Sequence, residues 1–69
     1  MVEVIIERWT RPDSTTEYRW SLWRDGHRIA TGRKAFTDAE FTDADDCEIE
    51  AVGFCVKALG KKPDKVTRL

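Results

Sequence analysis

The segment 38–59 contains the clearest helical pattern in the chain and constrains the fold more than any other. From Ile49 to Leu59 the sequence is at its most apolar, and apolar side chains recur there with the three-to-four-residue period of a helix. Thr42 or Asp43 is predicted to cap the start of this helix, and Gly60 is predicted to end it. We therefore expect one amphipathic helix against which the rest of the chain packs.

The apolar surface of this helix is wider than one sheet face can cover. On a helical projection the apolar side chains span roughly 220°, whereas a surface helix needs about 100°. Only Glu50, Gly53 and Lys57 are left on the opposite face. Either Phe36 and Phe41 cover the remaining surface together with the C-terminal tail, or a second chain covers it.

Side-chain patterns indicate the first two of the three β-strands that are predicted before the helix. Val2, Val4 and Ile6 alternate with other side chains, which indicates a strand with one buried face. After a turn, the segment Thr16–Arg24 is rich in the β-branched and aromatic residues typical of strands.

The dipeptide Asp25-Gly26 predicts a tight hairpin between the second strand and a third, which runs from His27 to Arg33. A two-residue type I′ turn needs positive φ at both positions, and Asp-Gly is one of the sequences that favour it. The register expected from this turn pairs Arg24 with His27, Leu22 with Ile29 and Trp20 with Thr31.

These elements predict an α+β fold in a single small domain, residues 1–69. We expect a three-stranded antiparallel sheet with one helix packed across one face, in the order β-β-β-α, and a possible short fourth strand at 65–69. A core of this size rarely supplies more than about 3–5 kcal/mol of net stability. The predicted core face of the sheet collects Val2, Val4, Ile6, Tyr18, Trp20, Leu22 and Ile29.

The residues that most enzymes and metal sites need are scarce in this sequence. His27 is the only histidine and lies beside the hairpin turn, and no phosphate-binding glycine loop occurs. Cys47 and Cys55 are separated by roughly 12 Å along the helix, which is too far for a disulfide. Two cysteines and one distant histidine do not have the spacing of a zinc site. We therefore expect no enzyme activity, no catalytic residue, no metal and no cofactor.

Cysteine usage and hydropathy predict the compartment. Two reduced core cysteines are typical of a cytoplasmic protein, and no apolar run approaches the roughly 20 residues of a membrane-spanning helix. A net charge of −1 argues against a general nucleic-acid coat. We expect a cytoplasmic location and no membrane partner.

The most unusual feature is a block of seven carboxylates without a basic residue between positions 38 and 50. One interpretation is a solvated helix start, where the helix dipole favours negative charges. Another is an array of carboxylates that binds a basic partner, with electrostatic attraction speeding the association. A calcium site is a third interpretation, although the ligand spacing of an EF-hand is absent. The candidate binding residues of this acidic patch are Asp38, Glu40, Asp43, Asp45, Asp46 and Glu50.

The expected outer face of the sheet carries a second candidate surface, formed by Trp9, Arg19, Trp23 and Arg28. Aromatic rings can stack unpaired bases while arginines hold phosphates, so this face suits single-stranded nucleic acid. Tryptophan and arginine are also enriched at the energetic centres of protein interfaces. A purely structural interpretation pairs Trp23 with Arg28 in a cross-strand cation–π contact.

The run from Glu17 to Gly26, followed by Gly32-Arg33 and then a helix, resembles small phage-encoded α/β proteins, some anti-CRISPR proteins among them. The shared features are a Tyr-led strand, an Arg-Asp-Gly hairpin and one later helix. The resemblance implies a non-catalytic inhibitor that binds a nucleic-acid-guided nuclease complex, often by masking a basic nucleic-acid site. No residue role is carried over, because anti-CRISPR proteins share no common motif.

Three functional hypotheses follow from these patterns. The leading one is a protein-binding module, an accessory or inhibitor protein of a phage or mobile element, whose acidic patch mimics nucleic acid on a basic surface of a protein partner. The first alternative is a single-stranded nucleic-acid-binding module that uses the outer sheet face. The second alternative is a structural homodimer, which the wide apolar surface of the helix suggests.

Overall fold

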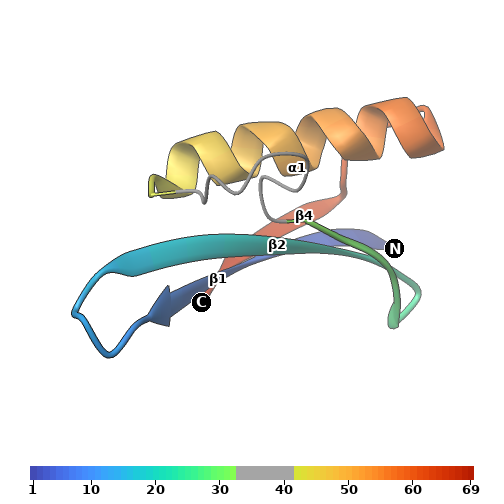
Figure 1. Cartoon of the computed structure of the whole chain (residues 1–69). Helices are drawn as coiled ribbons and strands as arrows, with labels where there is room; N and C mark the ends of the chain where they lie inside the picture. The colour runs from blue at the N-terminus through green and yellow to red at the C-terminus, as the bar shows by residue number, and fades with distance from the viewer. Residues whose placement is uncertain (33–41) are drawn as a thin grey trace.

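The computed structural model describes residues 1–32 and 42–69 of the chain. In these residues, four strands form one sheet and one helix lies across one of its faces (Figure 1). The predicted α+β class and the β-β-β-α order are confirmed, and the possible fourth strand is present. The elements in chain order are β1 (Val2–Thr10), β2 (Thr16–Arg24), β3 (His27–Gly32), α1 (Ala44–Leu59) and β4 (Lys65–Arg68).

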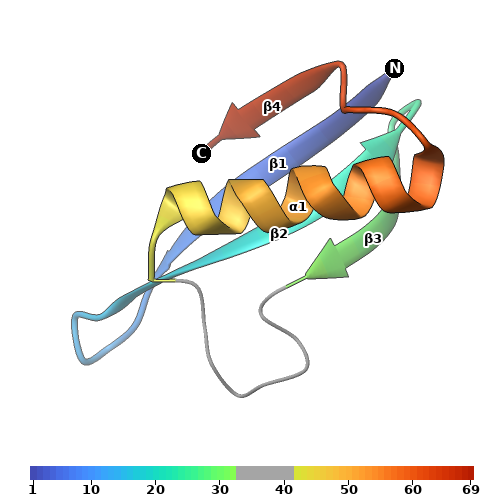
Figure 2. The same ribbon diagram turned by 90° about the horizontal axis from the view of Figure 1, so that it is seen from above.

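The strand order across the sheet is β3-β2-β1-β4, which Figure 2 shows from above. β1 pairs antiparallel with β2, and β2 with β3, but β4 runs parallel to β1. Parallel neighbours need a long connection that carries the chain back along the sheet, and α1 lies within that connection. The sheet is therefore mixed rather than purely antiparallel.

Alternation along β1 and β2 gives the sheet one buried face and one outer face. Val4 pairs with Leu22 and Ile6 with Trp20, and all four side chains are buried. The helix covers this face with small side chains, which allow it to lie close to the strands. The buried residues of α1 are Cys47, Ala51 and Cys55.

The β2–β3 hairpin has the predicted turn. Asp25 (φ 51°) and Gly26 (φ 80°) both have positive φ, as a type I′ turn requires. Arg24 pairs with His27, as expected from a two-residue loop.

The register beyond this turn is not the predicted one. A β-bulge between Leu22 and Trp23 inserts one extra residue into β3. Ile29 is consequently 42% exposed instead of being a core residue, and Ala30 packs against the core in its place. The observed pairs are Leu22 with Ala30, Ser21 with Thr31 and Trp20 with Gly32.

Both ends of α1 have the predicted caps. The carboxylate of Asp43, the N-cap, accepts a hydrogen bond from the backbone N–H of Asp45 at 2.7 Å. Gly60 has the left-handed conformation (φ 73°) and donates its N–H to the carbonyl of Val56 at 2.9 Å.

The strand β4 is tied to β1 beyond the sheet hydrogen bonds. The carboxylate of Asp64 accepts the backbone N–H of Val2 at 2.7 Å, and this contact holds the pKa of Asp64 below its ordinary value. At the other end, the N–H of Leu69 donates to the carbonyl of Ile6 at 2.9 Å. These bonds fix the chain that follows α1.

Part of the apolar surface of α1 stays exposed. Ile49 is 70% exposed, Phe54 42% and Val56 41%. Phe36 and Phe41, which the sequence predicts to cover part of this surface, lie outside the residues that the structure describes. The described residues therefore leave part of the apolar surface of α1 uncovered.

Candidate functional site

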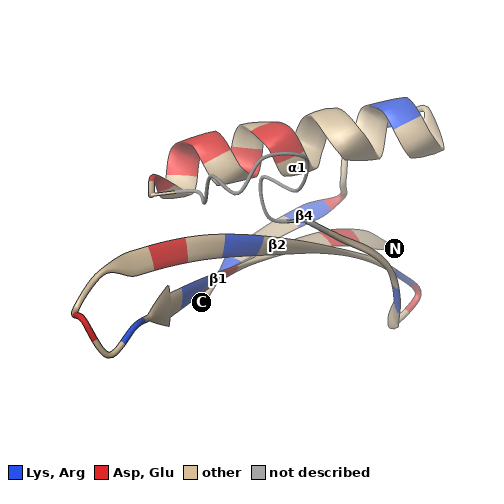
Figure 3. Cartoon of the chain, viewed as in Figure 1, with Lys and Arg blue, Asp and Glu red and all other residues tan. Residues whose placement is uncertain are grey.

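Acidic residues gather in the first half of α1, and a basic residue lies near its end (Figure 3). Asp38 and Glu40, two of the predicted site residues, lie outside the described residues. The other four predicted site residues are described by the structure, and they differ in their contacts within the chain: Asp43, Asp45, Asp46 and Glu50.

Arg68, at the end of β4, neutralises one side of the helix start. Its guanidinium group donates to Oδ1 of Asp45 at 2.6 Å and to Oε1 of Glu48 at 3.1 Å. The hydrogen bond to Asp45, and to a lesser extent that to Glu48, raises the pKa of Arg68 above its ordinary value. Asp45 therefore has a cationic partner within the chain.

Glu50 contacts the edge of the core. Its Oε2 accepts a hydrogen bond from Nε1 of Trp20 at 3.0 Å. Trp20 is only 5% exposed, so its indole N–H needs an acceptor within the protein. Phe54, one turn later, contacts the same indole with ring centroids 5.1 Å apart. The sequence places Glu50 on the face opposite the core, whereas the structure places it on the flank next to Trp20.

Three of the acidic residues share one side of the helix, which we call the acidic flank: Asp43, Asp46 and Glu50. Their spacing of three and four residues brings them onto the same side, and all three are exposed. The side chain of Asp46 makes no hydrogen bond or ion pair with another described residue. Among the described residues, the carboxylates at the start of the helix thus form two groups. One is the acidic flank, and the other is Asp45 and Glu48, which hydrogen-bond to Arg68.

The sheet face turned away from α1 carries the second candidate surface. The guanidinium carbon of Arg19 lies 4.7 Å from the ring centroid of Trp9, which is 47% exposed. Trp23 is half-buried, donates from Nε1 to Oγ of Ser21 at 2.8 Å and pairs across the strands with Arg28. The cation–π contact found is thus between Trp9 and Arg19, whereas the sequence suggested Trp23 and Arg28.

Glu17 is the residue on this face that the sequence reading missed. It is 2% exposed, and it accepts hydrogen bonds from Nε of Arg19 at 2.6 Å and from Nη2 of Arg11 at 2.8 Å. Burial raises the pKa of Glu17, but the hydrogen bonds and charges of the two arginines outweigh burial and hold that pKa below its ordinary value. Arg19 is therefore already paired and is poorly placed to hold a phosphate. The available signal was a carboxylate two residues before an arginine on one strand face.

We expect the acid sensitivity of the fold to depend on Glu17. A carboxyl group with a depressed folded-state pKa stabilises the fold above its unfolded-state pKa, and this contribution is lost as the pH falls towards and through the folded-state value. For Glu17 the loss begins near its ordinary pKa of 4.5. Glu17→Gln should lower the free energy of unfolding at neutral pH by about 1–3 kcal/mol, and should lose less stability than the parent on further acidification.

Urea unfolding followed by circular dichroism across this pH range measures both effects. Glu7→Gln, on the same face, is the matched control and should follow the parent closely. Within the described residues, the carboxylate of Glu7 hydrogen-bonds only to the indole N–H of the exposed Trp9, at 3.0 Å. Parallel pH profiles of the parent and Glu17→Gln would contradict the assigned role.

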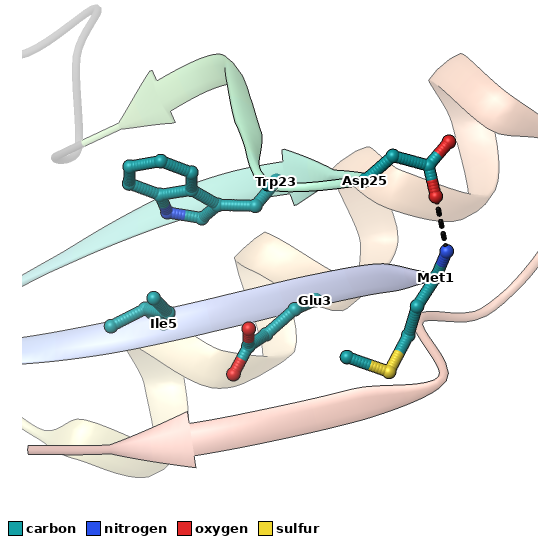
Figure 4. A pocket seen from close by; sticks show the side chains of 6 residues that line it. Met1, Glu3, Ile5, Trp23 and Asp25 are labelled. Carbon is teal, nitrogen blue, oxygen red and sulfur yellow. Dashed lines mark hydrogen bonds and ion pairs between the residues drawn. The ribbon is translucent and has the colours of Figure 1, made fainter.

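A depression of about 370 Å³ opens on the outer face beside the β2–β3 turn (Figure 4). The amino group of Met1 donates to Oδ1 of Asp25 at 2.5 Å, and Oε2 of Glu3 accepts the hydroxyl of Thr67 at 2.7 Å. Both carboxylates of the depression are therefore engaged within the chain. It is lined by Met1, Glu3, Ile5, Trp23, Asp25 and Gly26.

The side chains that could bind a metal or act as nucleophiles are dispersed or buried in the described residues. Within residues 1–32 and 42–69, no group of three or more His, Cys, Asp and Glu side chains could hold a metal ion. Cys47 and Cys55 are free and buried. Burial raises the pKa of the Cys47 thiol to about 11 and also raises that of Cys55. Both thiols therefore stay protonated near neutral pH, and neither is an activated nucleophile.

In the part of the chain that the structure describes, no helix has the length and hydropathy to cross a membrane. Comparison with protein-family models, with curated proteins and with solved structures finds no match to this chain.

Proposed function

We propose that this chain is a small non-catalytic protein-binding module that binds a basic surface of a protein partner through the acidic flank of α1. The observation that carries the proposal is the carboxylate of Asp46. It is exposed, it lies between Asp43 and Glu50 on one side of the helix, and it makes no ion pair with another described residue. A carboxylate without a counter-charge gains most from a cationic partner.

The two neighbours of Asp46 are held in place by the fold. Asp43 is fixed as the N-cap through its bond to the N–H of Asp45, and Glu50 is fixed by the indole of Trp20. Three like charges on one side of a helix repel one another, and lysine or arginine side chains of a partner relieve this repulsion. The flank is thus a preorganised anionic array that favours rapid association with a basic surface.

A nucleic-acid site on a nucleic-acid-guided nuclease complex is a basic surface of this kind. The resemblance of residues 17–59 to anti-CRISPR proteins leads us to propose such a complex as the partner. The chain then acts in the cytoplasm as an inhibitor of phage or mobile-element origin, its carboxylates occupying the place of backbone phosphates. Two buried, free cysteines are compatible with a reducing compartment.

The proposal is tested with a double variant that removes two negative charges from the acidic flank, Asp46→Asn with Glu50→Gln. The glutamine keeps an oxygen that can accept the indole N–H of Trp20, so the fold is retained while two charges are removed. The probe is a fluorescently labelled arginine-rich peptide, titrated with the protein at low ionic strength. We expect the double variant to bind about tenfold more weakly, because each exposed ion pair contributes up to about 1 kcal/mol.

The matched control is the double variant Glu3→Gln with Glu7→Gln. It also removes two negative charges, but from the outer sheet face. Its glutamines keep oxygen atoms that can accept the hydroxyl of Thr67 and the indole N–H of Trp9. We expect this control to bind the peptide as the parent does, apart from a small effect of net charge. Equal weakening by both double variants would show that net charge alone attracts the peptide, and the acidic flank would lose its assigned role.

Single-stranded nucleic acid is the second candidate ligand, and the outer sheet face favours it through one observation. Trp9 is 47% exposed on a face that no described element covers, and Arg19 lies over its ring. Because Glu17 already pairs with Arg19, we rank this function below protein binding. Titration with a single-stranded oligonucleotide at low salt should quench tryptophan fluorescence if this function is present, and Trp9→Ala should remove the quenching.

A further inference from the structure

The side of α1 turned away from the sheet forms an outer surface of the molecule (Figure 1). Ile49 is 70% exposed and Val56 is 41% exposed, and Gly53 lies between them in the sequence. With spacings of four and three residues, these positions share one side of the helix. No described element lies over this side, so its centre is apolar and is not covered by the part of the chain that the structure describes.

Gly53 is unusual because none of the described residues requires a glycine there. A Cβ atom added at this position would meet no described atom within 4 Å outside its own stretch of helix. Glycine inside a helix is destabilising relative to alanine, and its use is to let another backbone approach closely. A second helix lying across Gly53 would make contact with Ile49 and Val56 on either side.

The two ends of this surface carry opposite charges. Asp46 lies three residues before Ile49, and Lys57 directly follows Val56. Both charged side chains are exposed, and neither makes an ion pair with another described residue. A second copy of the same helix matches this pattern when it runs antiparallel, because a parallel copy brings acid against acid and base against base.

We infer that this side of α1 is the interface of a symmetric homodimer, in which two copies of the helix pack antiparallel and cross near Gly53. In such an interface each contact occurs twice, so Ile49 of each copy contacts Val56 of the other. When the two-fold symmetry axis of the dimer passes midway between Val52 and Gly53, Lys57 lies level with Glu48 of the other copy. Asp46 of that copy lies about 3 Å further along the helix, within reach of the lysine side chain.

The interface is small, since it consists of one helix pair. We therefore expect a weak dimer that dissociates in the micromolar range or above and forms as the protein is concentrated. The inference of a dimer does not rest on the proposed basic partner. Both interactions use the carboxylate of Asp46, however, so a basic partner and Lys57 of the second copy compete for it.

Sedimentation of the parent over a wide range of concentrations tests for the dimer. We expect the apparent mass to rise from the 8.0 kDa of the monomer towards twice that value. Ile49→Lys should raise the dissociation constant by about tenfold or more. The matched control, Leu69→Lys, also replaces an exposed aliphatic side chain by lysine. Leu69 is 73% exposed on another part of the surface, so this variant should leave the dissociation constant unchanged.

Charge exchange tests the antiparallel arrangement. Asp46→Lys and Lys57→Asp should each weaken the dimer, because each places like charges together twice, while the double variant should restore dimerisation. Thermal unfolding at low concentration checks that the single variants are folded. A parent that stays monomeric up to millimolar concentration overturns the inference. So does a dimer that is insensitive to Ile49→Lys, or a double variant that is no better than the single ones.

Discussion

Trp20→Ala should unfold most of the protein. The side chain is 5% exposed, packs against Phe54 and donates its indole N–H to Glu50. Truncation of a buried tryptophan to alanine costs about 3–5 kcal/mol, and a domain of this size rarely has more than about 3–5 kcal/mol of net stability. Circular dichroism at neutral pH should show a largely disordered chain, and urea should produce little further change.

Trp20→Phe separates packing from hydrogen bonding at the same position. Phenylalanine keeps an aromatic side chain in the core but has no N–H to donate to Glu50, and it leaves a small gap where the larger indole lay. We expect a folded variant that is destabilised by about 1–3 kcal/mol in urea unfolding. A Trp20→Ala variant with a native spectrum and an unchanged urea midpoint would contradict the assignment of Trp20 to the core.

Ile6→Ala should destabilise the fold far more than Ile29→Ala. Ile6 is 1% exposed on the central strand β1, whereas Ile29 is 42% exposed at the bulge in β3. The same deletion should cost about 2–5 kcal/mol at Ile6 and well under about 1 kcal/mol at Ile29. The two variants are matched, because both shorten an isoleucine in a strand of the same sheet.

Urea unfolding of both isoleucine variants, followed by circular dichroism, makes the comparison. Equal destabilisation would mean that Ile29 is a core residue, as the regular hairpin register predicts. It would therefore contradict the bulge and restore the pairing of Leu22 with Ile29.

The strands and the turn could be predicted because their signals are local. Alternation at Val2, Val4 and Ile6 defines a strand without reference to the rest of the chain, and Asp25-Gly26 selects its turn type through backbone sterics alone. The bulge could not be predicted in this way. The bulge leaves no signal in the amino-acid composition of β3. Only packing beneath the helix decides whether Ile29 or Ala30 faces the core.

The contacts of the acidic patch depend on how distant elements meet. Arg68 reaches Asp45 because β4 runs parallel to β1, which places the end of the chain beside the start of α1. Likewise, Glu50 reaches Trp20 only because of the rotation of α1 about its own axis. The sequence showed that carboxylates are concentrated there, but the three-dimensional arrangement decides which of them have partners.

A similar limit applied to the outer sheet face. The sequence correctly grouped its tryptophans and arginines, because strand alternation places them on one side. It paired Trp23 with Arg28, whereas Arg19 lies over Trp9 and is anchored by Glu17. The choice between neighbouring partners depends on where the nearest carboxylate lies, and a pattern of alternation does not contain that information.

The most direct test of the account maps the binding surface by NMR. ¹⁵N-labelled protein is titrated with the arginine-rich peptide at low salt, and amide and indole N–H signals are followed separately. We expect the largest shifts at the amides of residues 43–50, while the indole signals of Trp9 and Trp23 stay in place. Shifts centred on those two indoles, or no shifts at residues 43–50, would contradict the claim that the acidic flank of α1 is the binding surface.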